Sequence, residues 1–256
     1  MFQKDLFKDK VVLVTGGRSG IGYTIAEQFL QCGAKVWIAS RKEEPLNEAA
    51  EKLRQLGPVS AKACNIREIE AVEALAAAVK EEDGRLDVLI NNAGGQFPSR
   101  AQDISLKGWE AVINNNLNGT WYMTQTFGKE FFIPQKAGNV VNIIVNLFRG
   151  FPGMAHTGAA RAGIENFTKS LAVEWSPYNI RLNNIAPGII HSSGLDQYPP
   201  ELLKGLSDNI PMKRLGTTAE VGWLALFLAS PMAGFITGES IYVDGGQRLH
   251  GDTYKL

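Results

Sequence analysis

Residues 15–22 read TGGRSGIG, and the predicted architecture follows from this short stretch. It comes after an apolar, mostly β-branched run at 11–15 and before a segment with helical apolar spacing at 21–31. Glycines at 16, 20 and 22 permit a tight turn, a close approach of phosphate and close packing of a helix on a strand. A helix that begins here also offers free N–H groups and the positive end of its dipole to phosphate. We therefore predict a dinucleotide-binding turn rather than a glycine-rich turn without a ligand; its residues are Gly16, Arg18, Ser19, Gly20, Ile21 and Gly22.

The alternation of short apolar runs and helical stretches continues along the chain. Strands are expected at 11–15, 35–39, 59–63, 86–90, 140–145, 180–185 and 240–243, and helices at 21–31, 43–56, 68–82, 105–114, 118–134, 157–175 and 219–229. Most of these strands are apolar throughout, which is typical of parallel strands covered on both faces. The pattern predicts an α/β Rossmann fold, a doubly wound parallel sheet of about seven strands with helices on both faces. A chain of 256 residues fits a single domain over 1–256.

The segment 187–211 is rich in Gly, Pro, Ser and Asp and is too long for a plain connection. We interpret residues 189–211 or so as a lid over the substrate.

Composition argues against several classes of protein. Lys and Arg number 26 and so do Asp and Glu, whereas nucleic-acid binders usually carry a basic excess. No apolar run approaches the roughly 18 residues that span a bilayer, and residues 1–10 lack the apolar core of a signal peptide. Cys32 and Cys64 lie in no metal-ligand spacing, so we expect free thiols, no metal site and a reducing, cytoplasmic location.

The residues after the second expected strand suggest which dinucleotide is bound. A site specific for NAD normally places an acid there for the ribose 2′-hydroxyl, but here the sequence runs Ser40, Arg41, Lys42 before the first acids. Arg41 and Lys42, together with Arg18 of the glycine turn, can neutralise a 2′-phosphate. We therefore predict a preference for NADPH, the alternative being that Arg41 and Lys42 are solvated charges at a helix start.

Further short motifs accompany the glycine turn: NNAG at 91–94, NLNG at 116–119, APG at 186–188 and VDGG at 243–246. Together they resemble the short-chain dehydrogenase/reductase superfamily over about residues 10–246. Five longer stretches resemble the peroxisomal trans-2-enoyl-CoA reductase branch, and the 2,4-dienoyl-CoA reductases are a slightly more distant match. These stretches are 91–97, 107–109, 141–145, 156–163 and 235–246.

The resemblance implies where the cofactor and a partner subunit bind. Asn65 and Ile66 should flank the adenine, and Ile190 should meet the nicotinamide carboxamide. The implied cofactor-binding residues are Asn65, Ile66, Asn92, Ala93, Gly94, Arg161, Pro187, Gly188 and Ile190. A homotetramer is also implied, with helices 118–134 and 157–175 in the subunit contact. The small residues 158–160 suit such a contact, although an ordinary contact within the subunit explains them equally well.

The sequence departs from the family at the catalytic positions. Members usually have a Ser, a Tyr, a Lys four residues after the Tyr, and an Asn. Aligned on residues 161–164, the Lys position is Arg161, the Tyr position Thr157 and the Ser position Ile144, and only Asn116 matches. The substitute Tyr of dienoyl-CoA reductases falls on Asn146, and a Tyr proposed for the enoyl-CoA branch falls on Glu165.

The groups that remain favour one chemistry over another. Carbonyl reduction needs a proton for the developing alkoxide, and Thr157 is a very weak acid. Reduction of an enoyl thioester instead moves charge to the thioester oxygen, where fixed donors can stabilise it. We therefore expect an NADPH-dependent oxidoreductase that reduces the 2,3 double bond of an enoyl-CoA or related acyl thioester. Asn116 and Thr157 would act near the thioester oxygen, and Arg161, permanently charged, would anchor the cofactor.

Several alternatives remain open. The chain could be a 3-oxoacyl or alcohol carbonyl reductase with a rewired site, or a non-catalytic NADP-binding protein. His156 is expected to be a buried structural histidine rather than a general acid. Glu165 is expected to form an ion pair with Arg161, one helical turn away. Residues 254–256, YKL, match a peroxisomal address only in the last two positions, so the cytoplasmic expectation stands.

Overall fold

The computed structural model describes residues 2–195 and 205–250. Its centre is a seven-stranded sheet in the order β3-β2-β1-β4-β5-β6-β9, in which every neighbouring pair is parallel. The strands are β1 (Val11–Thr15), β2 (Lys35–Ser40), β3 (Val59–Ala63), β4 (Val88–Asn91), β5 (Gly138–Ile143), β6 (Ile180–Pro187) and β9 (Ser240–Val243). The predicted doubly wound parallel sheet is therefore confirmed. Because the chain runs outward from β1 in one direction and from β4 in the other, the strand order reverses between these two strands.

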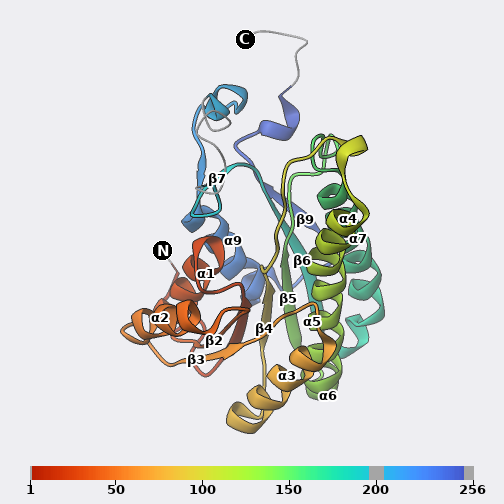
Figure 1. The fold of residues 1–256 in the computed structure, drawn as a ribbon. Coiled ribbons are helices and arrows are strands. Elements are labelled where there is room, and N and C mark those ends of the chain that lie inside the picture. Colours follow the sequence, from red (N-terminus) through yellow and green to blue (C-terminus); the bar gives the residue numbers. More distant parts are fainter. Residues whose placement is uncertain (1, 196–204, 251–256) are drawn as a thin grey trace.

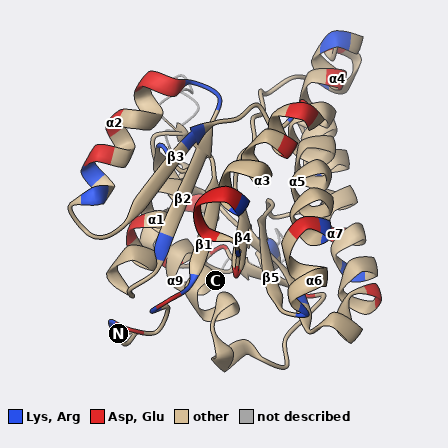
Figure 2. Ribbon diagram, turned by 90° about the horizontal axis from the view of Figure 1, so that it is seen from below, with Lys and Arg blue, Asp and Glu red and all other residues tan. Residues whose placement is uncertain are grey.

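Helices cover both faces of the sheet (Figure 1). Helices α1 (Gly20–Gln31), α2 (Glu43–Arg54) and α9 (Thr218–Ala229) pack on one face. Helices α3 (Ile69–Asp83), α5 (Gly119–Phe127) and α7 (Ala155–Glu174) pack on the other. Alternate residues of β1 serve the two cores, since Val12 and Val14 face the first set of helices and Val11 and Leu13 the second. Charged residues of both signs lie mainly on the outer helices and loops (Figure 2).

One long helical run replaces the two helices expected at 105–114 and 118–134. Helix α4 (Leu106–Ile113) continues through the π-helical turn η2 (Asn114–Asn118) into α5, and a second π-turn, η3 (Gly128–Phe132), leads into α6 (Ile133–Gln135). The hydroxyl of Thr120 donates to the carbonyl of Asn116 at 2.7 Å inside η2. The gap expected between the two helices is thus a wide turn within a continuous helical run, a feature frequent at functional sites.

A ladder of polar side chains crosses the sheet on the side of α5 and α7. Asn91, Asn142, Asn184 and Ser240 occupy matching positions on β4, β5, β6 and β9. Each Asn donates from Nδ2 to the next residue, at 2.9, 3.2 and 3.0 Å in turn. Thr168 of α7 joins the ladder through Asn142 and Asn184. Since the three asparagines are buried, these bonds fix the relative register of four strands.

The segment interpreted as a lid has structure of its own in its described parts. Strand β7 (Ile190–His191) pairs in parallel with β8 (Gly216–Thr217), and a short 3₁₀ helix, η6, covers Leu206–Asn209. Residues 196–204 of the expected lid and the tripeptide at 254–256 lie outside the described residues. Across the residues that are described, no helix combines the length and the apolar character needed to cross a membrane.

Candidate functional site

The glycine turn lies at the carboxyl ends of β1 and β4, where the strand order reverses and open parallel sheets bind ligands. Gly16 and Gly20 have φ of +67° and +56°, values that other residues rarely adopt. A Cβ at Gly22 would lie 2.4 Å from Nδ2 of Asn92 and 2.5 Å from the carbonyl oxygen of Gly16. Asn92 in turn donates to the carbonyl of Thr15 at 3.0 Å. The turn therefore packs directly against the loop after β4.

The start of helix α1 fits a phosphate group. Its N-cap, Ser19, is extended and makes no side-chain capping bond, and the first turn of the helix contains no acidic residue. The first N–H groups are therefore left without a side-chain acceptor, at the positive end of the helix dipole. A dinucleotide pyrophosphate supplies the acceptors and the negative charge that these groups lack.

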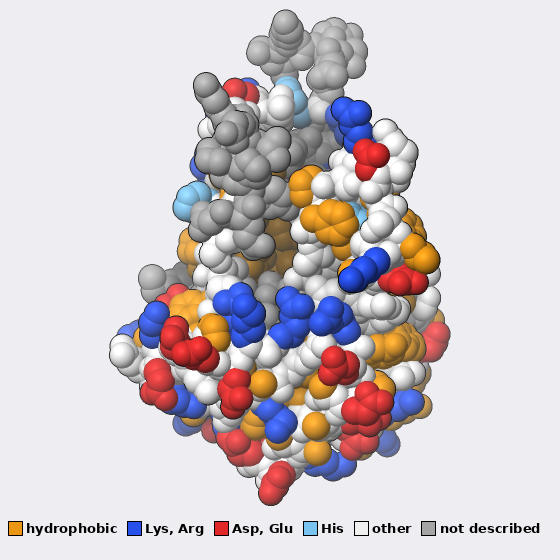
Figure 3. Space-filling view, in the orientation of Figure 1, with side chains coloured by type: hydrophobic (Ala, Val, Ile, Leu, Met, Phe, Trp, Pro, Cys, Tyr) orange, Lys and Arg blue, Asp and Glu red, His pale blue; other side chains and the backbone are white. Residues whose placement is uncertain are grey.

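The residues expected at the 2′-phosphate and the adenine follow three adjacent strands: Arg18 follows β1, Arg41 and Lys42 follow β2, and Asn65 and Ile66 follow β3. Arg18, Arg41 and Lys42 are exposed, and within the described residues none of them forms a salt bridge. Several Lys and Arg side chains lie in a row across the middle of the face shown in Figure 3. Asn65 donates to Glu68 at 2.5 Å and accepts from Nε of Arg67 at 2.9 Å, which orients its amide.

Asn116 and Arg161, which the sequence places at the expected catalytic centre, are in direct contact. Asn116 is fully buried in η2, and its Oδ1 accepts from Nη2 of Arg161 at 3.0 Å and from the N–H of Gly95 at 3.1 Å. Its Nδ2 donates to the carbonyl of Gly95 at 2.7 Å. Nη1 of Arg161 donates to the carbonyl of Ile143 at 3.0 Å. Arg161 thus ties the π-turn to the end of β5.

Arg161 is a buried cation, and none of the described residues supplies a counterion for it. It is 7% exposed, and within the described part of the chain its guanidinium bonds only to neutral oxygens, with Nε left without a partner. Burial lowers the pKa of Arg161 to about 10, which still leaves it charged at neutral pH. A Cβ at Gly94 would lie 2.2 Å from Nη2, so the glycine lets the loop after β4 pass over the guanidinium. The site therefore carries a positive potential that could stabilise a developing negative charge.

His156 and Thr157 lie in the first turn of α7, which begins at Ala155, two residues before the expected start. Both side chains are fully buried. Nδ1 of His156 is 2.8 Å from the main-chain nitrogen of Thr157 and 3.4 Å from its Oγ1. The ring of Phe97, from the loop after β4, meets the imidazole edge to face with centroids 4.6 Å apart. Thr157 is thus on the same helix face as Arg161, one turn before it.

Three other positions singled out in the sequence have structural partners. Ile144 packs in a small buried apolar cluster with Ile164 and Ala186. Asn146 donates to Asp244 at 3.1 Å. Glu165 pairs with Lys169 at 3.0 Å, so the expected ion pair with Arg161 is wrong. The reason is that Arg161 turns inward to Asn116 and Ile143, whereas the half-buried Glu165 bonds to Lys169.

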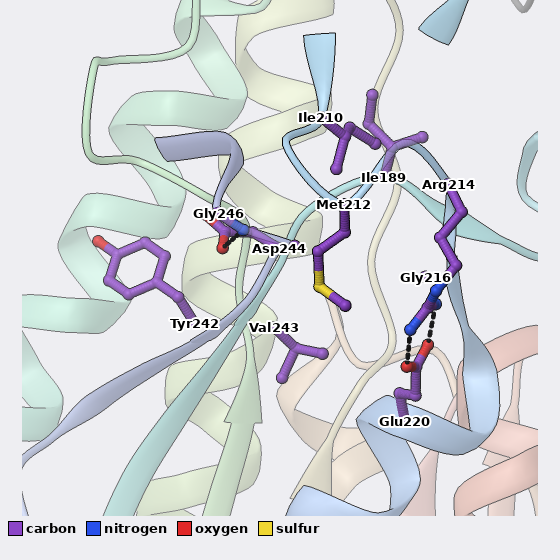
Figure 4. A pocket seen from close by; sticks show the side chains of 11 residues that line it. Ile189, Ile210, Met212, Arg214, Gly216, Glu220, Tyr242, Val243, Asp244 and Gly246 are labelled. Carbon is purple, nitrogen blue, oxygen red and sulfur yellow. Dashed lines mark hydrogen bonds and ion pairs between the residues drawn. The ribbon is translucent and has the colours of Figure 1, made fainter. Parts of the chain in front are cut away.

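Sequence reasoning missed a cavity of about 300 Å³ between the segment interpreted as a lid, the end of β9 and the start of α9 (Figure 4). Ile189, Ile210, Met212 and Val243 supply apolar walls. Arg214 forms two bonds to the carboxylate of Glu220, at 2.9 and 2.6 Å, across one side. The pairing with Arg214 holds the pKa of Glu220 at about 2. The one sequence signal was the capping box of Thr217 and Glu220 at the start of α9.

Known proteins resemble this chain over nearly its whole length. A family model described as enoyl-(acyl carrier protein) reductase matches residues 16–248. A probable 2,4-dienoyl-CoA reductase of Bacillus subtilis is 36% identical over 94% of this chain and 97% of its own length. The peroxisomal 2,4-dienoyl-CoA reductase of Rattus norvegicus is 38% identical over 96% and 86%, respectively. The solved structure of a citronellol catabolism dehydrogenase from Pseudomonas aeruginosa has a TM-score of 0.88 at 38% identity, covering 97% of this chain and 98% of that one.

Proposed function

The chain belongs to the short-chain dehydrogenase/reductase family of oxidoreductases, and from that premise we propose that it reduces the 2,3 double bond of enoyl-CoA or dienoyl-CoA thioesters with NADPH. The observation that carries the proposal is the buried, unneutralised guanidinium of Arg161 in a site where Thr157 takes the position of the usual tyrosine. Such a site is rich in positive potential and poor in proton donors. Enoyl thioester reduction tolerates that combination, because its charge develops on an oxygen that fixed donors can hold.

The proposed cofactor is NADP(H). Gly16, Ser19, Gly20, Ile21 and Gly22 would hold the pyrophosphate, supported by the free start of α1. Arg18 and Arg41, which are exposed and form no salt bridge with any residue that the structure describes, would meet the 2′-phosphate. When bound, the reduced nicotinamide supplies a hydride to Cβ of the substrate. The remaining residues proposed around it are Asn65, Ile66, Asn92, Ala93, Gly94, Arg161, Pro187, Gly188 and Ile190.

The protein's own residues divide the work on the substrate. Thr157 would donate a hydrogen bond to the thioester oxygen, and Arg161 would stabilise the enolate by its charge. Asn116 already bonds to Gly95 and to Arg161 through both ends of its amide. Its geometry therefore supports a positioning role, in which it holds the guanidinium and the loop after β4 in place. The Cα proton would come from water, because no strong acid is proposed in the site.

A second candidate is carbonyl or alcohol chemistry, which the name of the dehydrogenase from Pseudomonas aeruginosa suggests. Both candidates are tested by following NADPH oxidation with enoyl-CoA substrates from crotonyl- to dodecenoyl-CoA, with 2,4-hexadienoyl-CoA and with acetoacetyl-CoA. Turnover of the unsaturated thioesters supports the proposal, and turnover of acetoacetyl-CoA alone selects the carbonyl reductase. Tight NADPH binding without any turnover would instead indicate a non-catalytic binding protein.

We also propose a homotetrameric, cytoplasmic enzyme whose 256 residues form a single domain. Helices α5 and α7 would form a subunit contact, which is supported by the exposed Val173 on α7. Cys32 and Cys64 are both free and buried, as expected in a reducing compartment. Size-exclusion chromatography with light scattering measures the assembly state.

A further inference from the structure

The side chain of His156 lies next to Thr157 of the proposed site, and one of its two ring nitrogens has no hydrogen-bond partner among the described residues. It is fully buried in the first turn of α7, next to Thr157, and Phe97 of the loop after β4 covers one side of the ring. In the described part of the protein, Nε2 has no hydrogen-bond partner. Buried polar groups are nearly always paired, so an unpaired one beside a proposed reaction centre points to a missing ligand.

The other ring nitrogen settles which tautomer is present. The main-chain N–H of Thr157 donates to Nδ1 at 2.8 Å, so Nδ1 is an acceptor and carries no hydrogen. The ring proton of the neutral imidazole therefore sits on Nε2. Nε2 is thus a hydrogen-bond donor for which the described residues provide no acceptor.

We propose that Nε2–H of His156 donates a hydrogen bond to the carbonyl oxygen of the bound acyl thioester, alongside Thr157; this inference rests on the proposed function. A neutral imidazole is a poor proton source, because losing Nε2–H would leave an imidazolate. It is a good fixed donor to an oxygen that gains negative charge, a use of histidine known from other enzymes. His156 therefore polarises the thioester and stabilises the enolate without giving up its proton.

The test uses two substitutions, each of which replaces the hydrogen-bonding role of only one of the two ring nitrogens. His156→Asn keeps an oxygen near Nδ1 as acceptor for Thr157 N–H but places no donor at Nε2. His156→Gln extends an amide donor to about the Nε2 position. We expect kcat for crotonyl-CoA to fall roughly 10²-fold in His156→Asn, as for other donors to an oxyanion, and to recover in part in His156→Gln. The dissociation constant of NADPH should stay within twofold in both variants.

A second readout does not require turnover. 2,4-Hexadienoyl-CoA bound to the protein with NADP⁺ cannot be reduced, and a donor at its carbonyl oxygen shifts its absorption band to longer wavelength. We expect that shift in the wild type and in His156→Gln, and a smaller shift in His156→Asn. An unchanged shift and unchanged kcat in His156→Asn would overturn the role of His156 while leaving the proposed function intact. A wild type that shows the His156-dependent shift but reduces no enoyl thioester would overturn the proposed function and keep the contact.

Discussion

Nη2 of Arg161 donates to Oδ1 of Asn116 at 3.0 Å. This bond joins helix α7 to the π-turn η2, which lies between α4 and α5. The guanidinium bonds to neutral acceptors only, so its charge is not compensated by the described residues around it. A buried charge of this kind costs stability, and it is retained where function needs it. We therefore expect the charge of Arg161 to lower the stability of the fold while contributing to the proposed catalysis.

Replacing Arg161 by Met should have opposite effects on stability and on activity. The apolar side chain has a similar reach and removes the desolvation cost of the charge, while Asn116 keeps its bonds to Gly95. We expect an unfolding free energy equal to or above that of the wild type and a kcat roughly 10²-fold lower. Urea unfolding and the enoyl-CoA assay measure the two quantities. Lys169→Met, an exposed change on the same helix, is the control. Strong destabilisation by Arg161→Met would mean that the arginine is structural.

The asparagine ladder should matter for stability rather than for cofactor binding. Asn142→Leu removes one of the two acceptors of Asn91 and leaves the buried Asn184 and Thr168 with one partner fewer each. We expect the protein to lose about 3 kcal/mol of unfolding free energy, since three buried hydrogen bonds are lost and each contributes about 1 kcal/mol. Urea unfolding measures the loss, and Asn47→Leu on the exposed side of α2 should change it by less than about 0.5 kcal/mol. Equal effects of the two changes would contradict a special role for the ladder.

The sheet and the glycine turn could be predicted from the sequence because both depend on local patterns. Apolar runs alternate with helical spacing, and the glycines of the turn need positive φ or a close approach whatever surrounds them. The sequence pattern predicts one helix that ends at 114 and another that begins at 118, yet residues 114–118 form a π-turn that joins them. Spacing along α7 pairs Arg161 with Glu165, but the buried acceptors that draw it inward come from β5 and η2. Such choices depend on segments far apart in the chain, which periodicity does not describe.

The ion pair between Arg214 and Glu220 gives a pH-dependent contribution to stability. The hydrogen bonds from Arg214 lower the pKa of Glu220 from its ordinary value of 4.5 to about 2 in the folded protein. The stabilisation is therefore fully present above about pH 4.5 and is lost as the pH falls towards 2. Glu220→Gln keeps the capping bond of α9 to Thr217 but removes the charge. We expect its Tm to lie about 1–3 °C below that of the wild type at pH 7, with the difference shrinking below pH 4.5. A gap that stays constant down to pH 3 would assign the effect to packing.

The glycine turn can be tested with two alanine substitutions of different kinds. In Gly22→Ala the new Cβ would lie 2.4 Å from Asn92 and 2.5 Å from Gly16, so the turn must open and cofactor affinity should fall at least tenfold. In Gly84→Ala the new Cβ meets nothing within 4 Å, but the residue has a φ of +66°. That change should cost about 1 kcal/mol of stability and leave cofactor affinity unchanged. Calorimetric titration with NADPH and urea unfolding distinguish the two, and equal losses of affinity would argue against the turn as the phosphate site.

The preference for NADPH over NADH should reside in the exposed arginines at the ends of β1 and β2. Reversing the charge with Arg41→Glu places a carboxylate where the 2′-phosphate is proposed to bind, so the dissociation constant of NADPH should rise at least tenfold. NADH lacks that phosphate, and its affinity should change less than twofold. Lys52→Glu makes the same charge reversal at an exposed position further along α2 and should alter neither affinity. Raising the ionic strength should also weaken the binding of NADPH more than the binding of NADH in the wild type, because the proposed contact between Arg41 and the 2′-phosphate is exposed and therefore screened. If Arg41→Glu raises the dissociation constants of NADPH and NADH equally, Arg41 does not contact the 2′-phosphate. A preference for NADPH must then come from Arg18 or Lys42.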